Sequence, residues 1–272
     1  MRLLFVGDVL GRAGREVLAA ALPELRRDLK LDFVVVNGEN AAHGAGISEK
    51  ICKEILAAGA DVVTGGNHSW DQREMLSYIE REPRLLRPQN FPPGTPGRGA
   101  AVVEAAGGRK VLVVNLMARL FMDPLDDPFA AIDRELARHR LGHTVSAAIL
   151  DFHGEATSEK MAMGHYVDGR VSLCVGTHTH VPTADAMILD GGTAYQTDAG
   201  MTGDYNSVIG MEKTAPIQRF TRKLPTERLT PAGGPATLCG TYIETDPRSG
   251  LATRIEPVRL GGRLAPTGPH LG

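Results

Sequence analysis

The chain has 272 residues, of which 42% are hydrophobic, and its formal net charge is −2. This length suits one large domain or two small ones, and it is sufficient to bury a sizeable core. The near-neutral charge argues against a strong general surface for nucleic acids, although a single arginine could still contact a phosphate.

The first third of the chain alternates between strands and helices. Short apolar runs predict strands at 3–6, 33–36 and 61–64. Helical segments are predicted at 15–29, from the N-cap residue Ser48 to about 58, and over 70–81. Strands and helices that alternate at this spacing indicate an α/β domain.

The remainder of the chain is richer in strands. The runs 100–103 and 111–115 resemble a hairpin, and a helix with Pro128 in its first turn extends to about 138. A short helix is predicted at 157–163, and further strands at 147–152, 173–176, 184–189, 193–196, 238–244 and 253–258. The segment 198–235 is rich in Gly and Pro and is predicted to be a long functional or mobile loop. We expect a single domain over residues 1–260 and a flexible C-terminal tail over 261–272.

Metal-binding or catalytic residue types follow five of the predicted strands. They are Asp8, Glu39 with Asn40, Asn67 with His68, His153, and His178 with His180. Each set has an ordinary explanation alone, such as a turn aspartate or a hydrogen-bonded core histidine. Ligand crevices of α/β sheets lie outside the carboxyl ends of strands, so the five sets together predict one shared site. In an extended GTHTHV segment (176–181), the imidazoles of His178 and His180 would point to the same side.

The residue types restrict the chemistry of this site. Carboxylates, amide oxygens and imidazoles form a mixed set that suits Mn, Fe, Co, Ni or Zn better than Mg or Ca. The candidate ligands are too many for one tetrahedral zinc, whereas two metal ions that share a bridging carboxylate fit their number. Such pairs lie ~3.5–4 Å apart and stabilise both the attacking and the leaving oxygen of an in-line displacement. A water that bridges them would become a hydroxide nucleophile at neutral pH.

The motifs that carry these residues also resemble a known family. They are GDVLGRAGR, VNGENAAHGAG, TGGNHSWDQ, DFHGEATSEK, VGTHTHVPTAD and TDAGMTGD. Their order resembles that of the calcineurin-like metallophosphoesterases, and their wording is similar to the YmdB-like family of small bacterial phosphodiesterases over residues 3–213. The resemblance implies an αββα sandwich of two mixed sheets flanked by helices and a dinuclear centre, with Fe or Mn favoured. It also implies hydrolysis of phosphodiesters, with 2′,3′-cyclic nucleotides as a substrate class.

The resemblance further implies a role for each site residue. Glu39 would bridge the two ions, with Asp8 and His180 on the first ion and Asn67, His153 and His178 on the second. His68 would be the proton donor near the phosphate and not a ligand. The broader superfamily has a D-x-H pattern at the first strand end, where this chain has Leu10. Asn40 is the best replacement for the missing ligand. Substrate contacts are less clearly indicated at His43, Thr202 and Gly203.

Several alternatives remain open at this stage. A phosphomonoesterase or nucleotidase uses the same type of centre, and a non-catalytic metal-binding nucleotide sensor would need the ligands but not His68. A (β/α)₈-barrel hydrolase also uses H-x-H, but it places this motif after its first strand.

Location and partners are indicated more coarsely. Three cysteines far apart in the sequence are typical of reduced thiols in a cytoplasmic protein. No apolar run is long enough for a membrane span. We expect a small phosphodiester or nucleotide as substrate and no membrane contact, while a homo-oligomer is possible.

Overall fold

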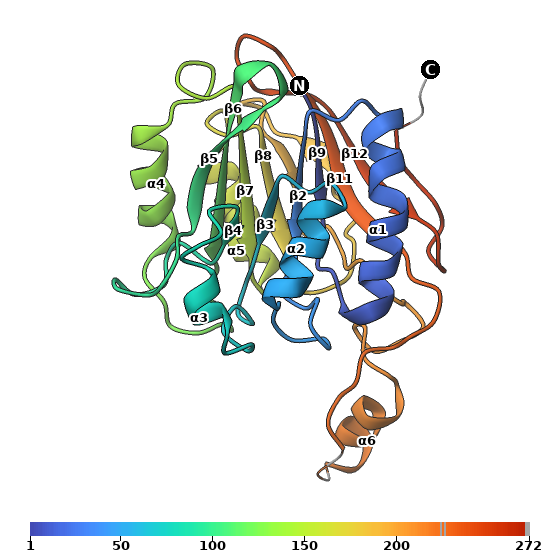
Figure 1. Cartoon of the computed structure of the whole chain (residues 1–272). Helices are drawn as coiled ribbons and strands as arrows, with labels where there is room; N and C mark the ends of the chain where they lie inside the picture. Colours follow the sequence, from blue (N-terminus) through green and yellow to red (C-terminus); the bar gives the residue numbers. More distant parts are fainter. Residues whose placement is uncertain (224, 226, 270–272) are drawn as a thin grey trace.

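The structure, a computed structural model, describes residues 1–223, 225 and 227–269. Within these residues, two six-stranded sheets pack face to face and helices cover their outer faces (Figure 1). The first sheet contains, in spatial order, β12 (Ala252–Leu260), β11 (Leu238–Thr245), β1 (Arg2–Val6), β2 (Phe33–Asn37), β3 (Val62–Thr64) and β4 (Leu85–Leu86). The second contains β5 (Ala100–Ala105), β6 (Arg109–Met117), β7 (Ala147–His153), β8 (Leu173–Thr177), β10 (Ala194–Gln196) and β9 (Met187–Ile188).

Both sheets are mixed, as predicted. In the first, β1, β2, β3 and β4 run parallel, while β11 and β12 are antiparallel to their neighbours. In the second, β6, β7, β8 and β10 run parallel, with β5 and β9 antiparallel at the edges. The αββα sandwich is therefore confirmed, and the (β/α)₈ barrel is excluded because the strands form two separate sheets.

Alternation along the strands divides the core into layers. In β1, Leu3 and Phe5 pack between the two sheets, whereas Leu4 and Val6 pack against the outer helices. The helices α1 (Gly11–Asp28) and α2 (Glu49–Ala57) cover the first sheet, and α4 (Pro128–Arg138) and α5 (Thr157–Tyr166) cover the second (Figure 1). Because strands such as β1 and β2 are covered on both faces, they are continuous apolar runs without polar alternation.

Most predicted elements are present, several of them two or three residues longer than predicted, and three differ more in extent. Helix α1 begins at Gly11, four residues before the predicted start. The predicted helix over 70–81 is reduced to α3 (Met75–Tyr78), because Asp71 and Gln72 bind His68 and the carbonyl of Ala45 and hold the preceding segment in turns. The strand predicted at 184–189 is only the two-residue β9.

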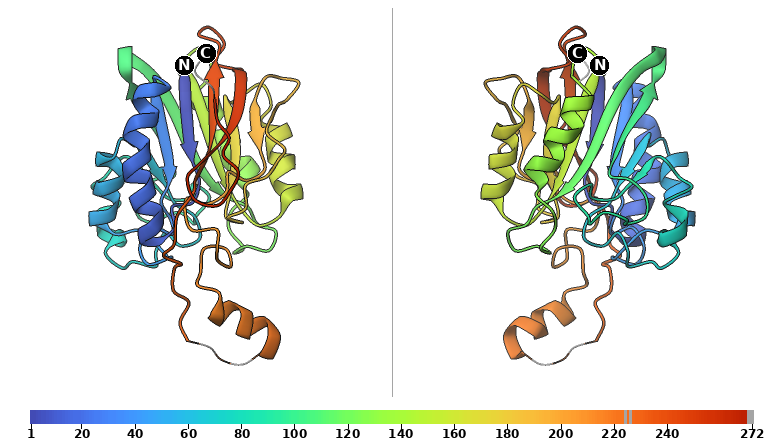
Figure 2. Two further views of the ribbon diagram at one scale, coloured as in Figure 1. Left: turned by 90° about the vertical axis from the view of Figure 1, so that its right-hand side faces the viewer. Right: turned by 90° about the vertical axis from the view of Figure 1, so that its left-hand side faces the viewer.

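Two further segments differ from, or extend, the sequence prediction. The segment 198–235 is not loop throughout, because it contains helix α6 (Thr214–Arg222), which projects from the body of the molecule (Figure 2). In the predicted tail, the backbone of Thr267 exchanges hydrogen bonds of 2.8 and 3.1 Å with Arg259 of β12. Residues 270–272 lie outside the described residues, and tail flexibility stays a prediction.

The three cysteines are buried and unpaired, as expected. Over the described part of the chain, no helix combines the length and apolarity that a membrane crossing requires.

Candidate metal centre

Strand ends from both sheets bring the candidate ligands together. Asp8 and Glu39 follow β1 and β2, and Asn67 follows β3 of the same sheet. His153 ends β7, and His178 follows β8 of the other sheet. The predicted convergence of strand ends is therefore present, and it joins residues from the two halves of the sandwich.

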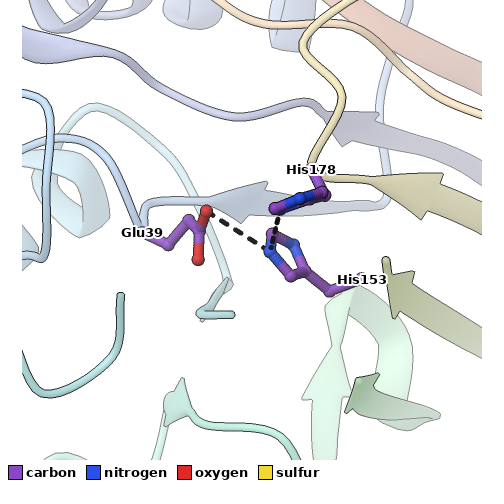
Figure 3. A group of neighbouring side chains, drawn as sticks. All are labelled: Glu39, His153 and His178. Carbon is purple, nitrogen blue, oxygen red and sulfur yellow. Dashed lines mark hydrogen bonds and ion pairs between the residues drawn. The ribbon is translucent and has the colours of Figure 1, made fainter. Parts of the chain in front are cut away.

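The side chains form two ligand groups that share one carboxylate. Asp8, Glu39 and His180 make one group, and Glu39, His153 and His178 make the other. In each group the potential ligand atoms lie within 4.8 Å of one another. Figure 3 shows the second group, in which the carboxylate of Glu39 and the ring of His178 both lie beside His153. Glu39 thus has the position that a bridging ligand requires.

In the second group, acceptor atoms face one another around Nε2 of His153. This nitrogen is 2.8 Å from Oδ1 of Asn67, 3.4 Å from Oε1 of Glu39 and 3.2 Å from Nδ1 of His178. The other ring nitrogen, Nδ1, is 2.9 Å from Oγ1 of Thr177, whose hydroxyl donates to Asp151 at 2.7 Å. This network assigns the proton of His153 to Nδ1 and leaves a lone pair on Nε2. Lone pairs that converge in a buried site repel one another unless a cation lies between them.

The other two histidines are oriented in the same way. Nε2 of His178 is 3.2 Å from a carboxylate oxygen of Glu155, so Nδ1 is the nitrogen on the side of His153. Nδ1 of His180 donates to the carbonyl of Ile209 at 2.8 Å, which leaves Nε2 as an acceptor 3.3 Å from Oδ1 of Asn40. Metal-binding histidines are generally held through their second nitrogen in this manner.

The position of Asn40 agrees with its expected role as a replacement ligand. Its amide nitrogen donates to the carbonyl of Gly44 at 3.2 Å, so its oxygen is directed toward His180. Leu10 is buried against Gly210 and does not line the cavity. The first group therefore has an amide oxygen beside His180 that a metal ion could use.

The H-x-H segment differs from its predicted geometry. Strand β8 ends at Thr177, and both His178 (φ 100°) and His180 (φ 67°) have left-handed backbone conformations. The predicted extended conformation is therefore wrong, whereas the expected convergence is present, because both histidines line one cavity and lie in the two ligand groups that share Glu39. Such strained backbone persists only where the surroundings enforce it.

A buried ion pair supports the strained segment. Lys160 of α5 donates to Asp198 at 2.9 Å and to the carbonyl of Thr177 at 2.7 Å. Asp198 also accepts hydrogen bonds from the backbone and the hydroxyl of Thr179, at 3.0 and 2.7 Å. Lys160 and Asp198 are essentially inaccessible to solvent. These hydrogen bonds therefore hold the loop between His178 and His180 in place.

The electrostatics of the site favour a bound cation. Burial, followed by the nearby Asp198, raises the pKa of Asp8 to about 8, and burial together with Asp8 raises the pKa of Glu39 well above its usual value. Burial and neighbouring positive groups lower the pKa of His153. Among the described residues, Oδ1 of Asp8 is buried without a hydrogen-bond partner. A divalent ion would satisfy this oxygen and stabilise the ionised carboxylates and neutral imidazoles, so the residues fit a metal centre.

Gly66 permits the close approach of the Gly-Asn-His turn. A Cβ atom at this position would lie 2.1 Å from Oε2 of Glu39 and 2.5 Å from Nε2 of His153. No side chain fits in this space, so the glycine before Asn67 is required by the site itself.

His68 lies beside the ligand groups without joining either of them. Its backbone N–H donates to Oε2 of Glu39 at 3.2 Å, and its Nδ1 is 2.7 Å from a carboxylate oxygen of Asp71. Nε2 is therefore the ring nitrogen left for a bound ligand. Glu39, Asn40, His68, His178 and His180 all line one cavity of about 800 Å³.

Of the three expected substrate contacts, only His43 lines this cavity. Thr202 and Gly203 are buried, and their backbone N–H groups already donate to the carbonyls of Asp8 and Thr237. Thr202 instead holds the turn that carries Asp8, so the expectation of substrate contacts at Thr202 and Gly203 is corrected.

Several supporting residues were missed from the sequence. They are Asp71, Asp151, Glu155, Lys160, Thr177 and Asp198. Only their closeness in the sequence to predicted site residues could have indicated some of them. Asp71 lies three residues after His68, Glu155 lies two residues after His153, and Asp151 lies two residues before it. Nothing local indicates that Lys160 and Asp198 pair.

Comparisons with known proteins agree with this geometry. A family model described as YmdB-like protein matches residues 4–258. The 2′,3′-cyclic-nucleotide 2′-phosphodiesterase of Bacillus subtilis (strain 168) is 48% identical over 260 residues, which cover 96% of this chain and 97% of that protein. A hypothetical protein from Thermus thermophilus has a crystal structure similar to this one, with a TM-score of 0.90, 43% identity, and coverage of 97% of this chain and 100% of that chain. A structure described as a novel phosphatase from Mycoplasma pneumoniae has a TM-score of 0.89, 33% identity, and coverage of 96% and 93%.

Proposed function

The chain belongs to the YmdB-like protein family, and we propose that it is a metal-dependent phosphodiesterase that hydrolyses 2′,3′-cyclic nucleotides. The observation that carries this proposal is the pair of ligand groups that share Glu39, with His68 beside them on the floor of one cavity. The printed activity of the Bacillus subtilis relative supports the substrate class.

The proposal assigns the ligands as the resemblance implied. Asp8, Asn40 and His180 would hold a first ion, Asn67, His153 and His178 would hold a second, and Glu39 would be shared between them. When bound, two divalent ions supply positive charge for the phosphate oxygens and lower the pKa of a water molecule. The mixed nitrogen and oxygen set favours Fe or Mn and is also compatible with Zn, Co or Ni.

The proposed role of His68 follows from its position. In hydrolysis, a water oxygen bonds to phosphorus, the bond from phosphorus to one ribose oxygen breaks, and that oxygen needs a proton. Asp71 holds Nδ1 of His68, so the proton would come from Nε2. A positioned acid of this kind contributes about 10²–10⁴-fold to the rate.

A substrate panel tests the proposed function. The metal-supplemented protein is assayed with 2′,3′-cyclic AMP, 3′,5′-cyclic AMP, AMP and bis(p-nitrophenyl) phosphate, each with Mn, Fe and Zn. We expect turnover of the 2′,3′-cyclic nucleotide to a monophosphate without release of inorganic phosphate. Faster phosphate release from AMP would make the protein a phosphomonoesterase. Tight nucleotide binding without any turnover would make it a sensor.

The substitution His68→Ala tests the proton donor. We expect both metal ions to remain, and kcat to fall about 10²–10⁴-fold on 2′,3′-cyclic AMP, whose ribose oxygen is a poor leaving group. The loss should be smaller on bis(p-nitrophenyl) phosphate, whose leaving group hardly needs a proton. His143→Ala, which removes an exposed histidine that does not line the cavity, is the matched control. Equal losses on both substrates would show that His68 positions the phosphate and does not donate a proton.

A further inference from the structure

Helix α6 stands away from the body of the molecule at the end of two extended legs (Figure 2). The legs are joined at their base, where the backbone N–H of Glu212 donates to the carbonyl of Thr230 at 2.8 Å and Met211 pairs with Pro231. We call residues 212–223, 225 and 227–230 the α6 arm. It projects from the end of the sandwich that carries the candidate metal centre (Figures 1 and 2).

The arm presents apolar side chains that its own packing does not use. Phe220 is 83% exposed and Ile217 is 51% exposed, while Pro216 is the one buried residue of α6. At this exposure Phe220 buries little apolar surface against the rest of the chain. Large exposed apolar groups of this kind commonly mark binding surfaces.

Phe220 lines the same cavity as several of the candidate ligands. The cavity is continuous from Glu39 and His178 on its floor to Pro216 and Phe220 on α6. Met211 at the base of the arm and Leu229 on its returning leg also line it. At about 800 Å³, the cavity lies in the upper part of the range of small-molecule sites, so a phosphate at the floor leaves room for a much larger group above it.

The base of the arm is also tied to the metal centre. Ile209 accepts the hydrogen bond from His180 through its backbone carbonyl, and its side chain lines the cavity. Arg228 on the returning leg brings a positive charge to the same cavity, which suits an anionic ligand. The polar end of the cavity at Glu39 and His178 suits the phosphate of a nucleotide, and its apolar end at Phe220 suits the base.

We propose, on the basis of the proposed function, that the inner face of the α6 arm is the nucleobase subsite, in which Phe220 stacks on the base of a nucleotide whose phosphate lies at the Glu39 centre. Every base has an aromatic face, so stacking on a phenylalanine tolerates different bases and is stronger for the larger purines. The arm therefore sets substrate selection, and the strand ends perform the chemistry.

Two cyclic diesters with the same reacting ring test this subsite. Ethylene phosphate carries the five-membered cyclic phosphate without a nucleoside, and 2′,3′-cyclic AMP carries it with a purine. Phe220→Ala should raise KM for 2′,3′-cyclic AMP roughly 5- to 150-fold, the range that loss of one base–aromatic stack gives, with little change in kcat. Kinetics on ethylene phosphate should be unchanged. Equilibrium binding of 3′-AMP should weaken by a similar factor, and Phe220→Trp should restore it.

Ile217→Ala is the matched control, because Ile217 is exposed on the same helix but does not line the cavity. An unchanged KM for 2′,3′-cyclic AMP in Phe220→Ala would overturn the subsite, as would an equal loss on ethylene phosphate. If Ile217→Ala raises KM for 2′,3′-cyclic AMP as much as Phe220→Ala does, and if sedimentation shows that both variants lose a concentration-dependent dimer that the parent forms, the arm contacts a second copy of the chain instead. If the parent hydrolyses neither cyclic diester, the proposed function fails, which is distinct from failure of the subsite alone.

Discussion

Removing the buried lysine under the H-x-H segment should destabilise both the fold and the metal centre. Lys160→Met keeps the length and the apolar stem of the side chain but removes the ammonium group. Asp198 then loses its charged partner, and the carbonyl of Thr177 loses a hydrogen bond. Because both charged groups are essentially inaccessible, water cannot replace the lost contacts without local opening.

The expected loss of unfolding free energy depends on the hydrogen bonds that Asp198 keeps in the variant. Breaking a buried ion pair by removing one partner costs about 3–5 kcal/mol. Three donors stay on Asp198, namely the N–H and hydroxyl of Thr179 and the N–H of Gly200, so we expect the lower end, about 3 kcal/mol. For a chain of this size, this corresponds to a Tm lower by roughly 6–12 °C. Because Asp198 anchors the loop between two proposed ligands, metal affinity should also fall, by about 10–100-fold.

Denaturant unfolding and metal titration of three variants provide the assay. The double variant Lys160→Met/Asp198→Asn removes both charges and should recover much of the loss of the single variant. Lys53→Met is the control, because it breaks an exposed pair with Glu49 and should change the stability by less than about 0.5 kcal/mol. The reasoning is refuted if Lys160→Met behaves like Lys53→Met, or if the double variant is no more stable than the single one.

Three further predictions concern the metal centre. Glu39→Gln should lose metal by elemental analysis and nearly all turnover while its circular dichroism stays that of the parent; two retained ions with normal activity would show that Glu39 is not the bridge. Asn40→Ala should weaken one of two metal-binding steps in calorimetry, whereas identical titrations for variant and parent would mean that another group fills this position. Chelator-treated protein should become less stable as the pH rises from about 4 to about 8, because burial raises the pKa of Asp8 to about 8 and the folded state binds a proton that the unfolded chain has released. Denaturant midpoints at about pH 5 and about pH 8 check this, and a higher midpoint at the upper pH without metal would contradict it.

Much of the architecture could be read from local sequence. Apolar runs that end in Gly-Asp, Gly-Glu-Asn and Gly-Asn-His are short-range signals, and the strands they predicted are present with boundaries within one or two residues. The same is true of the helix that Ser48 caps, because the serine accepts the expected hydrogen bond from Ile51 at 3.2 Å. The predicted helix over 70–81 failed, since Asp71 and Gln72 bind partners outside their own segment.

The residue types at the strand ends by themselves predicted the class of site. Carboxylate, amide and imidazole groups after parallel strands favour a metal site, and their surplus over one tetrahedral ion predicted a shared ligand. The sequence also indicated Asn40 as the substitute for the histidine missing at Leu10, and the structure places its amide oxygen beside His180.

The motif resemblance already implied how these residues divide between two groups, but only the tertiary structure decided the backbone geometry that separates them and the contacts that support it. His178 and His180 lie in different ligand groups because the backbone turns left-handed after Thr177, a conformation that the distant pair Lys160 and Asp198 anchors. The position of Phe220 over the cavity likewise depends on the pairing of the two legs of the arm. Such features arise from contacts between segments far apart in the chain, and no local pattern of hydrophobicity or turn residues encodes which distant segments will meet.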